Sequence, residues 1–284
     1  MVGPVVSSSL IFGTCLFCAS VSFTQLVKDP ETWLNGGYSF KESEVLRFGQ
    51  SQLHGTFVVR EGKRVFQKTE GFAEFCFNPQ GNIESSTVYK PYLSFADSIA
   101  QYHYYNEESL PTTIWKYDQR GYAKTKWGYQ NGKVVQESQF LGLNDGREML
   151  SNAYRIEHTL QHDTTTIESW YYVEGNLCQK IIIDGDAKDF PVKKTIISYP
   201  NEDTIVYRYF YNYRKIQSID IKKGREEYHI QVNYDVQAEV ESLKMTKNEN
   251  PFKEIQFVYG QTRHNLSSII FYDSTVNRME ILKF

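Results

Sequence analysis

The sequence predicts an all-β protein in which antiparallel β-hairpin repeats stack into one elongated twisted sheet. Aromatic residues make up 15% of the 284 residues, with 21 Tyr and 18 Phe, and such residues suit a pleated, half-buried surface. Short runs alternate apolar and polar residues, which is the period of a strand with one buried face. Turns with Gly or Asn separate these runs, as in β-hairpins. The same pattern allows a β-sandwich or barrel as the alternative.

The N-terminal region predicts export. Leu10–Ala19 is an apolar run of ten residues, which is too short to cross a bilayer but has the length of the apolar region of a signal peptide. The first basic residue is Lys28, so the usual positive start of a signal peptide is missing. We expect residues 1–24 to be a probable signal peptide and residues 25–284 to form a single β-repeat domain. The alternatives are a buried N-terminal helix or strand and an uncleaved membrane anchor.

The hairpins follow one another from about residue 55 to the C-terminus, and successive ones begin roughly 20–25 residues apart, as stacked supersecondary units do. The paired runs are 56–60 with 64–68, 75–77 with 83–89, 114–117 with 122–127, 127–129 with 134–140, 168–173 with 177–183, 206–211 with 216–221, 227–234 with 240–245, and 255–259 with 266–272. Asn131-Gly132 is the strongest turn signal, because both residues tolerate positive φ. Only Asp97–Tyr105 and Gly146–Thr159 could hold a short helix.

Two motifs carry a resemblance to known repeat families. Tyr117-Asp118-Gln119-Arg120-Gly121, followed by a β segment, resembles the tyrosine-aspartate (YD) repeat of Rhs-type bacterial surface and toxin-shell proteins. The run from Tyr129 to Glu137 resembles the variant MORN-type repeat of small bacterial exported or antitoxin-like proteins, and Tyr171–Leu177 is a weaker copy. The resemblance covers residues 75–180. It implies a sheet of β-hairpin repeats, and neither family brings catalytic residues with it.

The chain lacks the common signatures of catalysis and of cofactor binding. It has no P-loop, no GxGxxG after a strand, no HExxH and no GxSxG. The formal net charge of -3 gives no general attraction to nucleic acid. We therefore expect no enzymatic activity, no cofactor and no metal site, and we expect His158 and His162 to be solvent-facing histidines beside a turn. Cys76 and Cys178 could form one disulfide or remain two buried free thiols.

Paired aromatic residues are the best candidates for a binding site. They are Trp115, Tyr117, Trp127, Tyr129, Trp170 and Tyr172. Because neighbouring strand residues point to opposite faces, some of these belong to the core and others point outward. A row of exposed aromatic residues would bind a protein or glycan partner.

Together these features favour an exported (periplasmic, cell-surface or extracellular) non-enzymatic binding or scaffolding protein. The alternatives are an immunity or antitoxin-like partner protein and a carbohydrate-active hydrolase on a β scaffold. We expect no transmembrane span, since the strands look short, and charged on both faces, for a lipid-facing barrel.

Overall fold

The structure is a computed structural model. It describes residues 32–33, 37–40, 42–47, 49, 51–92, 97–118, 121–143, 146–162, 164–188, 190–236, 239–260 and 266–284. The expected signal peptide, residues 1–24, lies outside the described residues. Within the described residues, no helix has both the length and the apolar character needed to cross a membrane.

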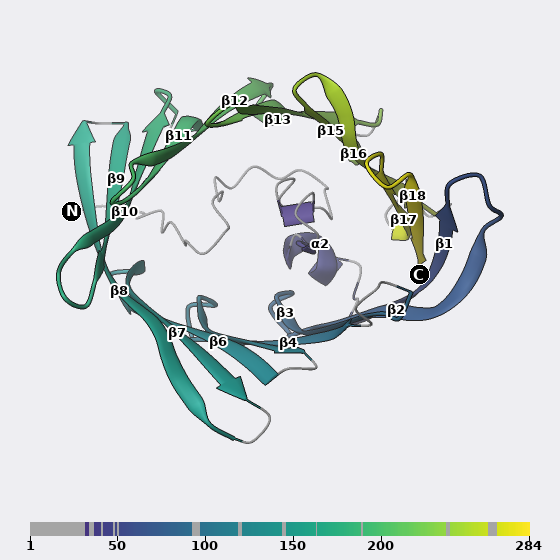
Figure 1. The fold of residues 1–284 in the computed structure, drawn as a ribbon, viewed down its shortest axis with the longest axis horizontal. Coiled ribbons are helices and arrows are strands. Elements are labelled where there is room, and N and C mark those ends of the chain that lie inside the picture. The colour runs from purple at the N-terminus through teal and green to yellow at the C-terminus, as the bar shows by residue number, and fades with distance from the viewer. Residues whose placement is uncertain are drawn as a thin grey trace, which may run out of the picture.

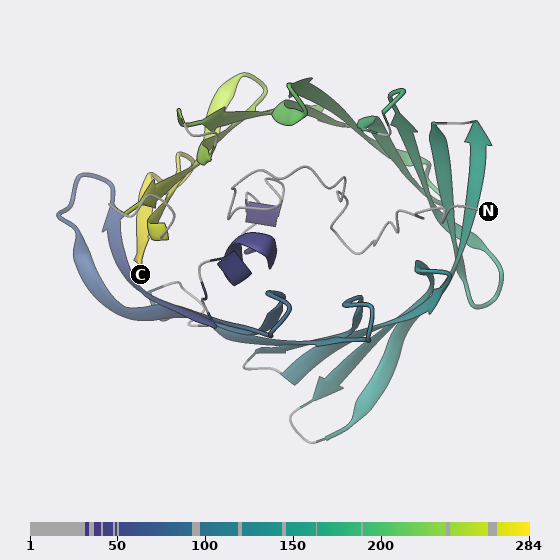
Figure 2. The ribbon, with the colours of Figure 1, turned by 180° about the vertical axis from the view of Figure 1, so that it is seen from behind.

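Eighteen antiparallel strands form a closed β-barrel (Figures 1 and 2). Each strand pairs with the next one in the chain, and β18 pairs with β1 to close the sheet. The strands are β1 Gln52–Glu61, β2 Gln67–Phe77, β3 Ile83–Lys90, β4 Asp97–Tyr105, β5 Pro111–Asp118, β6 Gly121–Gln130, β7 Lys133–Leu143, β8 Glu148–His162, β9 Thr165–Tyr172, β10 Leu177–Gly185, β11 Pro191–Ser198, β12 Asp203–Asn212, β13 Lys215–Lys223, β14 Glu226–Tyr234, β15 Val240–Lys247, β16 Asn250–Tyr259, β17 Leu266–Asp273 and β18 Arg278–Lys283.

The predicted antiparallel hairpins are confirmed, but the predicted single elongated twisted sheet is wrong, and the barrel alternative is correct. The seam between β1 and β18 runs from Thr56 opposite Lys283 to Glu61 opposite Arg278. Closure pairs the two outermost strands with each other and so removes the unpaired edges that an open sheet must protect. The charged run Lys222–Glu227 spans the end of β13, the turn and the start of β14, and both of these strands are paired on both sides.

A repeated tyrosine contact ties the hairpins together at one rim. In each case the phenol stands at or next to the end of an even-numbered strand and donates a hydrogen bond to a main-chain carbonyl at the start of the preceding strand, 18–22 residues earlier. The pairs are Tyr105 with Ile83 (2.7 Å), Tyr129 with Pro111 (2.6 Å), Tyr211 with Pro191 (2.8 Å), Tyr234 with Ile216 (2.8 Å) and Tyr259 with Val240 (3.0 Å). The same tyrosine contact therefore recurs in five of the hairpins.

A register shift accompanies each of these tyrosines. The shifts fall between Tyr104 and Tyr105, Gly128 and Tyr129, Phe210 and Tyr211, Asn233 and Tyr234, and Val258 and Tyr259. Such bulges bend a strand and increase its twist, and they are common at the rims of barrels. Their repetition at one rim supplies the curvature that closes the sheet.

Trp33, Tyr38, Phe40 and Val45, which precede the first strand, pack against the inner wall, where the main hydrophobic core lies. Helix α2 (Glu42–Arg47) lies inside the barrel (Figures 1 and 2). The Trp33 ring is 5.1 Å from the ring of Phe257, and the Phe40 ring is 5.1 Å from that of Phe75. A barrel of this strand number is wider than its own wall side chains can fill, so these N-terminal residues provide the apolar partner for β1, β2 and β16.

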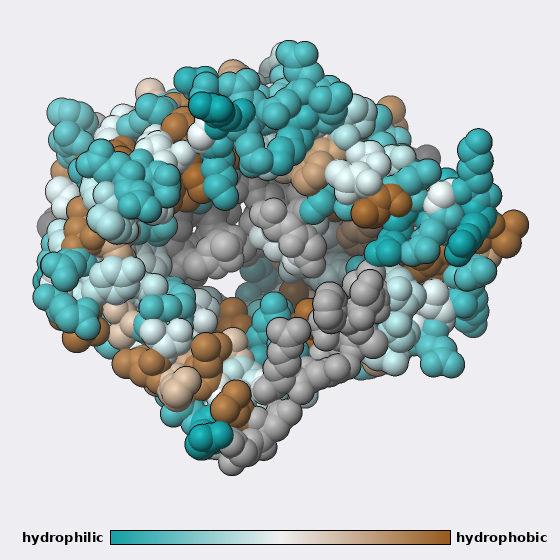
Figure 3. Space-filling view, viewed as in Figure 1, coloured by the Kyte–Doolittle hydropathy of each residue, from teal (hydrophilic) through white to brown (hydrophobic). Residues whose placement is uncertain are grey.

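The outer wall is largely polar. In β1 the burial pattern alternates strictly, with Leu53 and Phe57 inward and His54 and Thr56 outward. Charged residues recur at outward positions around the wall: Glu74, Lys126, Arg155, Lys180, Arg208, Asp220, Lys244 and Glu254. Figure 3 shows hydrophilic side chains over much of the rim.

Both segments expected to hold turns or a short helix are strands. Asp97–Tyr105 forms β4, and most of Gly146–Thr159 lies in β8. Each pairs with its neighbours on both sides, and this long-range pairing determines their conformation more than local propensity does.

Candidate binding surfaces

Four aromatic residues gather on the outer wall of β4, β5 and β6. Tyr102 lies opposite Trp115, and Tyr117 lies opposite Tyr122, so all four share one face. The Trp115 ring is 5.9 Å from that of Tyr117, with an interplanar angle of 8°, and 4.9 Å from that of Tyr122. The Tyr117 ring is 5.8 Å from Tyr102 and 5.6 Å from Tyr122. We call Tyr102, Trp115, Tyr117 and Tyr122 the aromatic patch.

A buried lysine on β6 and a carboxylate on β8 lie next to this patch and contact its rings. Lys124 is only 6% exposed, and its ammonium lies 4.6 Å from the ring centre of Trp115 and 4.5 Å from that of Phe140. It pairs with Glu148, which also accepts a hydrogen bond of 2.7 Å from the Tyr122 hydroxyl. These hydrogen bonds, first that from Lys124, lower the pKa of Glu148. The polar groups beneath the rings therefore satisfy one another.

Gly142 makes room for the patch. It lies opposite Tyr122 in the β6–β7 ladder, and a Cβ atom at this position would overlap the Tyr122 ring. The absence of a side chain lets the ring lie over the backbone of β7 and reach Glu148 on β8.

The patch is open to solvent. Tyr102 is 44% exposed and Tyr117 is 38% exposed, and Tyr104 and Leu150 extend the apolar area on either side. Contiguous exposed apolar residues mark interaction sites, and Tyr and Trp are enriched where protein partners bind.

Two of the six predicted aromatic residues lie in the patch, and three others meet in a core cluster on the inner wall. Trp115 and Tyr117 meet in the patch. Trp127 and Trp170 point inward, where the Trp127 indole donates to Glu137 at 2.7 Å and Trp170 is 9% exposed. Tyr129 makes the rim contact described above, and its burial raises its pKa to about 12. These residues do not form one row.

Tyr172 packs against Tyr154 at 5.7 Å, away from the patch. Tyr102 was missed because its segment was expected to form turns or a short helix, and Tyr122 because it directly follows a turn. The signal that could identify both is strand register, which places them opposite Trp115 and Tyr117.

The inner wall holds a buried carboxylate and histidine. His158 lies 2.6 Å from the Val134 carbonyl through Nε2 and 3.4 Å from Glu168 through Nδ1. Burial raises the pKa of Glu168 to about 7 and lowers that of His158. The expectation of a solvent-facing His158 is therefore wrong, because β8 turns this residue inward, whereas His162 is exposed. In the described part of the chain, no group of three or more His, Cys, Asp or Glu residues could hold a metal ion.

The two cysteines lie on separate strands and are free thiols. Cys76 is on the outer side of β2, and Cys178 is buried on β10 with its thiol 3.2 Å from the Trp170 carbonyl. Burial raises the pKa of Cys178, which keeps this thiol protonated and unreactive.

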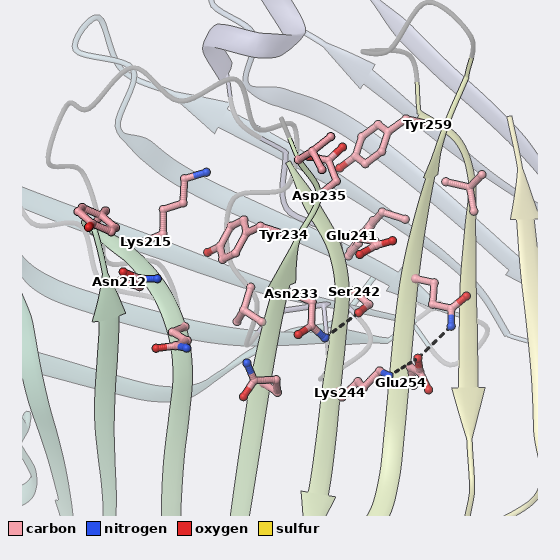
Figure 4. Close-up of a pocket in the computed structure, with 18 of the residues that line it drawn as sticks. Asn212, Lys215, Asn233, Tyr234, Asp235, Glu241, Ser242, Lys244, Glu254 and Tyr259 are labelled. Carbon is pink, nitrogen blue, oxygen red and sulfur yellow. Dashed lines mark hydrogen bonds and ion pairs between the residues drawn. The ribbon is translucent and has the colours of Figure 1, made fainter. Parts of the chain in front are cut away.

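A second surface is an open polar groove on the outer wall of β13 to β16 (Figure 4). Its volume is about 1280 Å³. We call it the polar groove and define it by the side chains of Gln217, Gln231, Asn233, Ser242, Glu254 and Gln256. No pattern in the sequence indicated it, because its residues come from four strands and are individually ordinary outward polar positions.

No protein-family model matches the chain, and no curated protein matches it. Among solved structures, a porin-like protein from Bacteroides uniformis is similar, with 9% identity, a TM-score of 0.41, and coverage of 82% of this chain and 95% of that one. The TcdB2-TccC3-Cdc42 structure has 13% identity and a TM-score of 0.26, and covers 72% of this chain and 13% of that one. The Tc holotoxin pore of Photorhabdus luminescens has 10% identity and a TM-score of 0.27, covering 76% and 16%.

Proposed function

We propose that this chain is an exported, non-enzymatic binding protein that holds a partner protein on the aromatic patch. The observation that carries the proposal is the contiguous set of rings, with Tyr102 and Tyr117 exposed, beside the buried Lys124 and its ion-pair partner Glu148. Such rings offer a large apolar area at a low cost in side-chain entropy. The satisfied ion pair beneath them leaves no unpaired charge to oppose the loss of water on binding.

The composition of the patch favours a protein over a glycan as the partner. Tyr122 and Lys124 direct their polar groups to Glu148, so these groups are not presented to a ligand. What remains at the surface is ring area with the Tyr102 and Tyr117 hydroxyls at its edge, bordered by Leu150. Tyrosine and tryptophan are among the usual residues of energetically dominant protein contacts.

The outer wall supports a location in water. Arg155, Lys180 and Arg208 point outward from the middle of their strands, and each would cost roughly 2–4 kcal/mol at the centre of a bilayer. The apolar run Leu10–Ala19 supports export. Together they favour a periplasmic, cell-surface or extracellular protein whose barrel is surrounded by water.

The closed sheet limits which surface an antitoxin-like protein could use to bind its toxin. Because β1 pairs with β18, capture of a partner by an edge strand has no free strand to use. An immunity function would therefore have to use the face of the sheet, and the aromatic patch is the surface suited to it.

The test compares patch variants in pull-downs from the native envelope fraction. We expect the full chain to recover one stoichiometric protein, and the double variant Tyr102→Ala/Tyr117→Ala to lose it. Phe66→Ala is the matched control, because Phe66 is 42% exposed on the separate β1–β2 hairpin. Equal recovery by the double variant, or recovery of a glycan alone, would exclude the proposed role of the patch.

N-terminal sequencing of the endogenous protein tests export. We expect a processed terminus near residues 21–25. An intact Met1 in the cytosolic fraction would contradict export, and a cytosolic toxin among the recovered partners would make the antitoxin-like role the leading one.

A further inference from the structure

We infer that the polar groove is a second binding site, and that it takes an extended, uncharged, hydroxyl-rich ligand of the oligosaccharide class. This inference is independent of the proposed function of the aromatic patch, because the two surfaces lie on different strands, β13 to β16 and β4 to β6.

The size of the groove points to a ligand of several linked units. Pockets for a single small molecule usually measure roughly 300–1,000 Å³, and this groove measures about 1280 Å³. Its defining side chains come from four neighbouring strands, β13 to β16 (Figure 4). A chain of sugar rings fits such a shape better than one compact molecule.

The groove is lined by neutral groups that both donate and accept hydrogen bonds. Gln217, Gln231, Asn233 and Gln256 each carry an amide with two donors and one acceptor oxygen. A sugar hydroxyl also donates and accepts hydrogen bonds. Two neighbouring hydroxyls of one sugar can therefore bond both the NH2 group and the oxygen of one amide. Asn233 donates to the Ser242 hydroxyl at 2.9 Å, which fixes the amide and leaves its oxygen for a ligand.

The charged residues of the groove largely compensate one another. The Lys244 ammonium lies 3.6 Å from Glu254, and Glu254 also accepts a hydrogen bond of 2.9 Å from Gln256. The lining as a whole contains two cations, Lys215 and Lys244, and three carboxylates, Asp235, Glu241 and Glu254. A mixed, nearly balanced lining gives little attraction to a strongly anionic or cationic ligand, which favours a neutral one.

A strained turn places an exposed aromatic ring at the lip of the groove. Tyr213 is 92% exposed and lines the groove, and both Tyr213 and Arg214 have positive φ, at 47° and 67°. Tight hairpin turns of this kind favour Asn-Gly, which is what the β6–β7 turn uses at Asn131-Gly132. Backbone strain at a ligand-facing position is typical of functional sites, and an exposed phenol offers a face on which a sugar ring can stack.

An extended peptide is a poorer match. A peptide that binds a sheet through its main chain needs an unpaired strand edge, and β13 to β16 are each paired on both sides. The lining also lacks a series of apolar pockets for alternate side chains, since most of its outward residues are amides and charged groups.

The test is isothermal titration of the full chain with neutral hexasaccharides (β-1,4-glucan, β-1,3-glucan and α-mannan) and with a tetra-alanine peptide and hexalysine as other classes. We expect one of the saccharides to bind, and Gln231→Ala/Gln256→Ala to raise its Kd roughly tenfold or more, since hydrogen bonds to two amides are lost. Gln136→Ala is the matched control, because Gln136 is an exposed amide on β7 outside the groove.

A turn variant separates binding from folding. Tyr213→Asn/Arg214→Gly should raise the Tm by about 2 °C or more, because Asn-Gly suits positive φ, while it weakens saccharide binding. The patch variant Tyr102→Ala/Tyr117→Ala should leave saccharide binding unchanged. The inference fails if no neutral saccharide binds, if only a peptide binds, or if the groove variants bind the saccharide as tightly as the unaltered chain.

Discussion

Replacement of Glu280 by Gln should destabilise the barrel at its seam. Glu280 lies on the inner side of β18 with its side chain 11% exposed, and it pairs at 2.6 Å with Lys90 of β3, which is 23% exposed. The Lys90 ammonium also lies 4.8 Å from the ring centre of Phe57, which is fully buried. Without the carboxylate, the Lys90 ammonium loses its ion-pair partner but stays beside the buried ring of Phe57 on β1, one of the two strands of the seam.

The expected loss is about 3 kcal/mol, because removal of one partner of a buried ion pair usually costs about 3–5 kcal/mol and Lys90 keeps some access to water. Such a change corresponds to a fall in Tm of roughly 6–12 °C for a chain of this size class. The exposed Arg278–Glu61 pair, at 2.8 Å on the same seam, is the control. Glu61→Gln should cost no more than about 1 kcal/mol.

Urea unfolding followed by tryptophan fluorescence measures the effect in Glu280→Gln, Lys90→Met and the double variant. We expect both single variants to lose stability and the double variant to recover most of it, because no unpaired charge then remains. If the double variant loses the sum of the two single losses, or if Glu280→Gln costs no more than Glu61→Gln, the interpretation of this pair as a buried, coupled contact is wrong.

Three further predictions concern the patch, the inner wall and the rim. Gly142→Ala should lower the Tm and alter the near-ultraviolet circular dichroism of the tyrosines, because the new Cβ displaces the Tyr122 ring, whereas Gly128→Ala should change both much less, since its Cβ would meet no aromatic ring and its nearest contact would be the Gln136 Cβ at 3.3 Å; equal effects would contradict the packing described. Burial raises the folded-state pKa of Glu168 above its ordinary value to about 7, so the stability that its protonated form contributes is present below about pH 4.5 and is lost as the pH rises towards 7. Burial also lowers the pKa of His103, to about 4, and that of His158, and both act in the opposite sense. The measurement is therefore the urea midpoint of the unaltered chain relative to that of Glu168→Gln, and this difference should fall between pH 5 and pH 7.5. Tyr234→Phe should cost about 1 kcal/mol of unfolding free energy, as the rim hydrogen bond to Ile216 is lost; an unchanged urea midpoint would show that this contact does not stabilise the hairpin.

The strands could be predicted from sequence because alternation and turn chemistry are local. Asn131-Gly132 does form the tight turn of the β6–β7 hairpin. Closure could not be predicted, because it depends on the accumulated twist of eighteen strands and on bulges at residues such as Tyr105 and Tyr234, whose positions follow from pairing.

The patch was only half predictable for a related reason. Period two places Trp115 and Tyr117 on one face, but it cannot say which face is outside. In this barrel both walls carry aromatic residues, so Trp127 follows the same pattern and points inward. The partners Tyr102 and Tyr122 come from neighbouring strands, and only the register brings them together.

The seam has a consequence for how the chain folds. Every other strand pairing joins neighbours in sequence, whereas the Arg278–Glu61 contact joins residues 217 positions apart. The sheet can therefore grow from one hairpin to the next by closing short loops, each with a small loss of chain entropy. Only the last step, the pairing of β1 with β18, closes a very long loop. A barrel built in this way should pass through an open, curved intermediate with the β1 and β18 edges unpaired, and during that interval the chain is most exposed to pairing with another copy of itself.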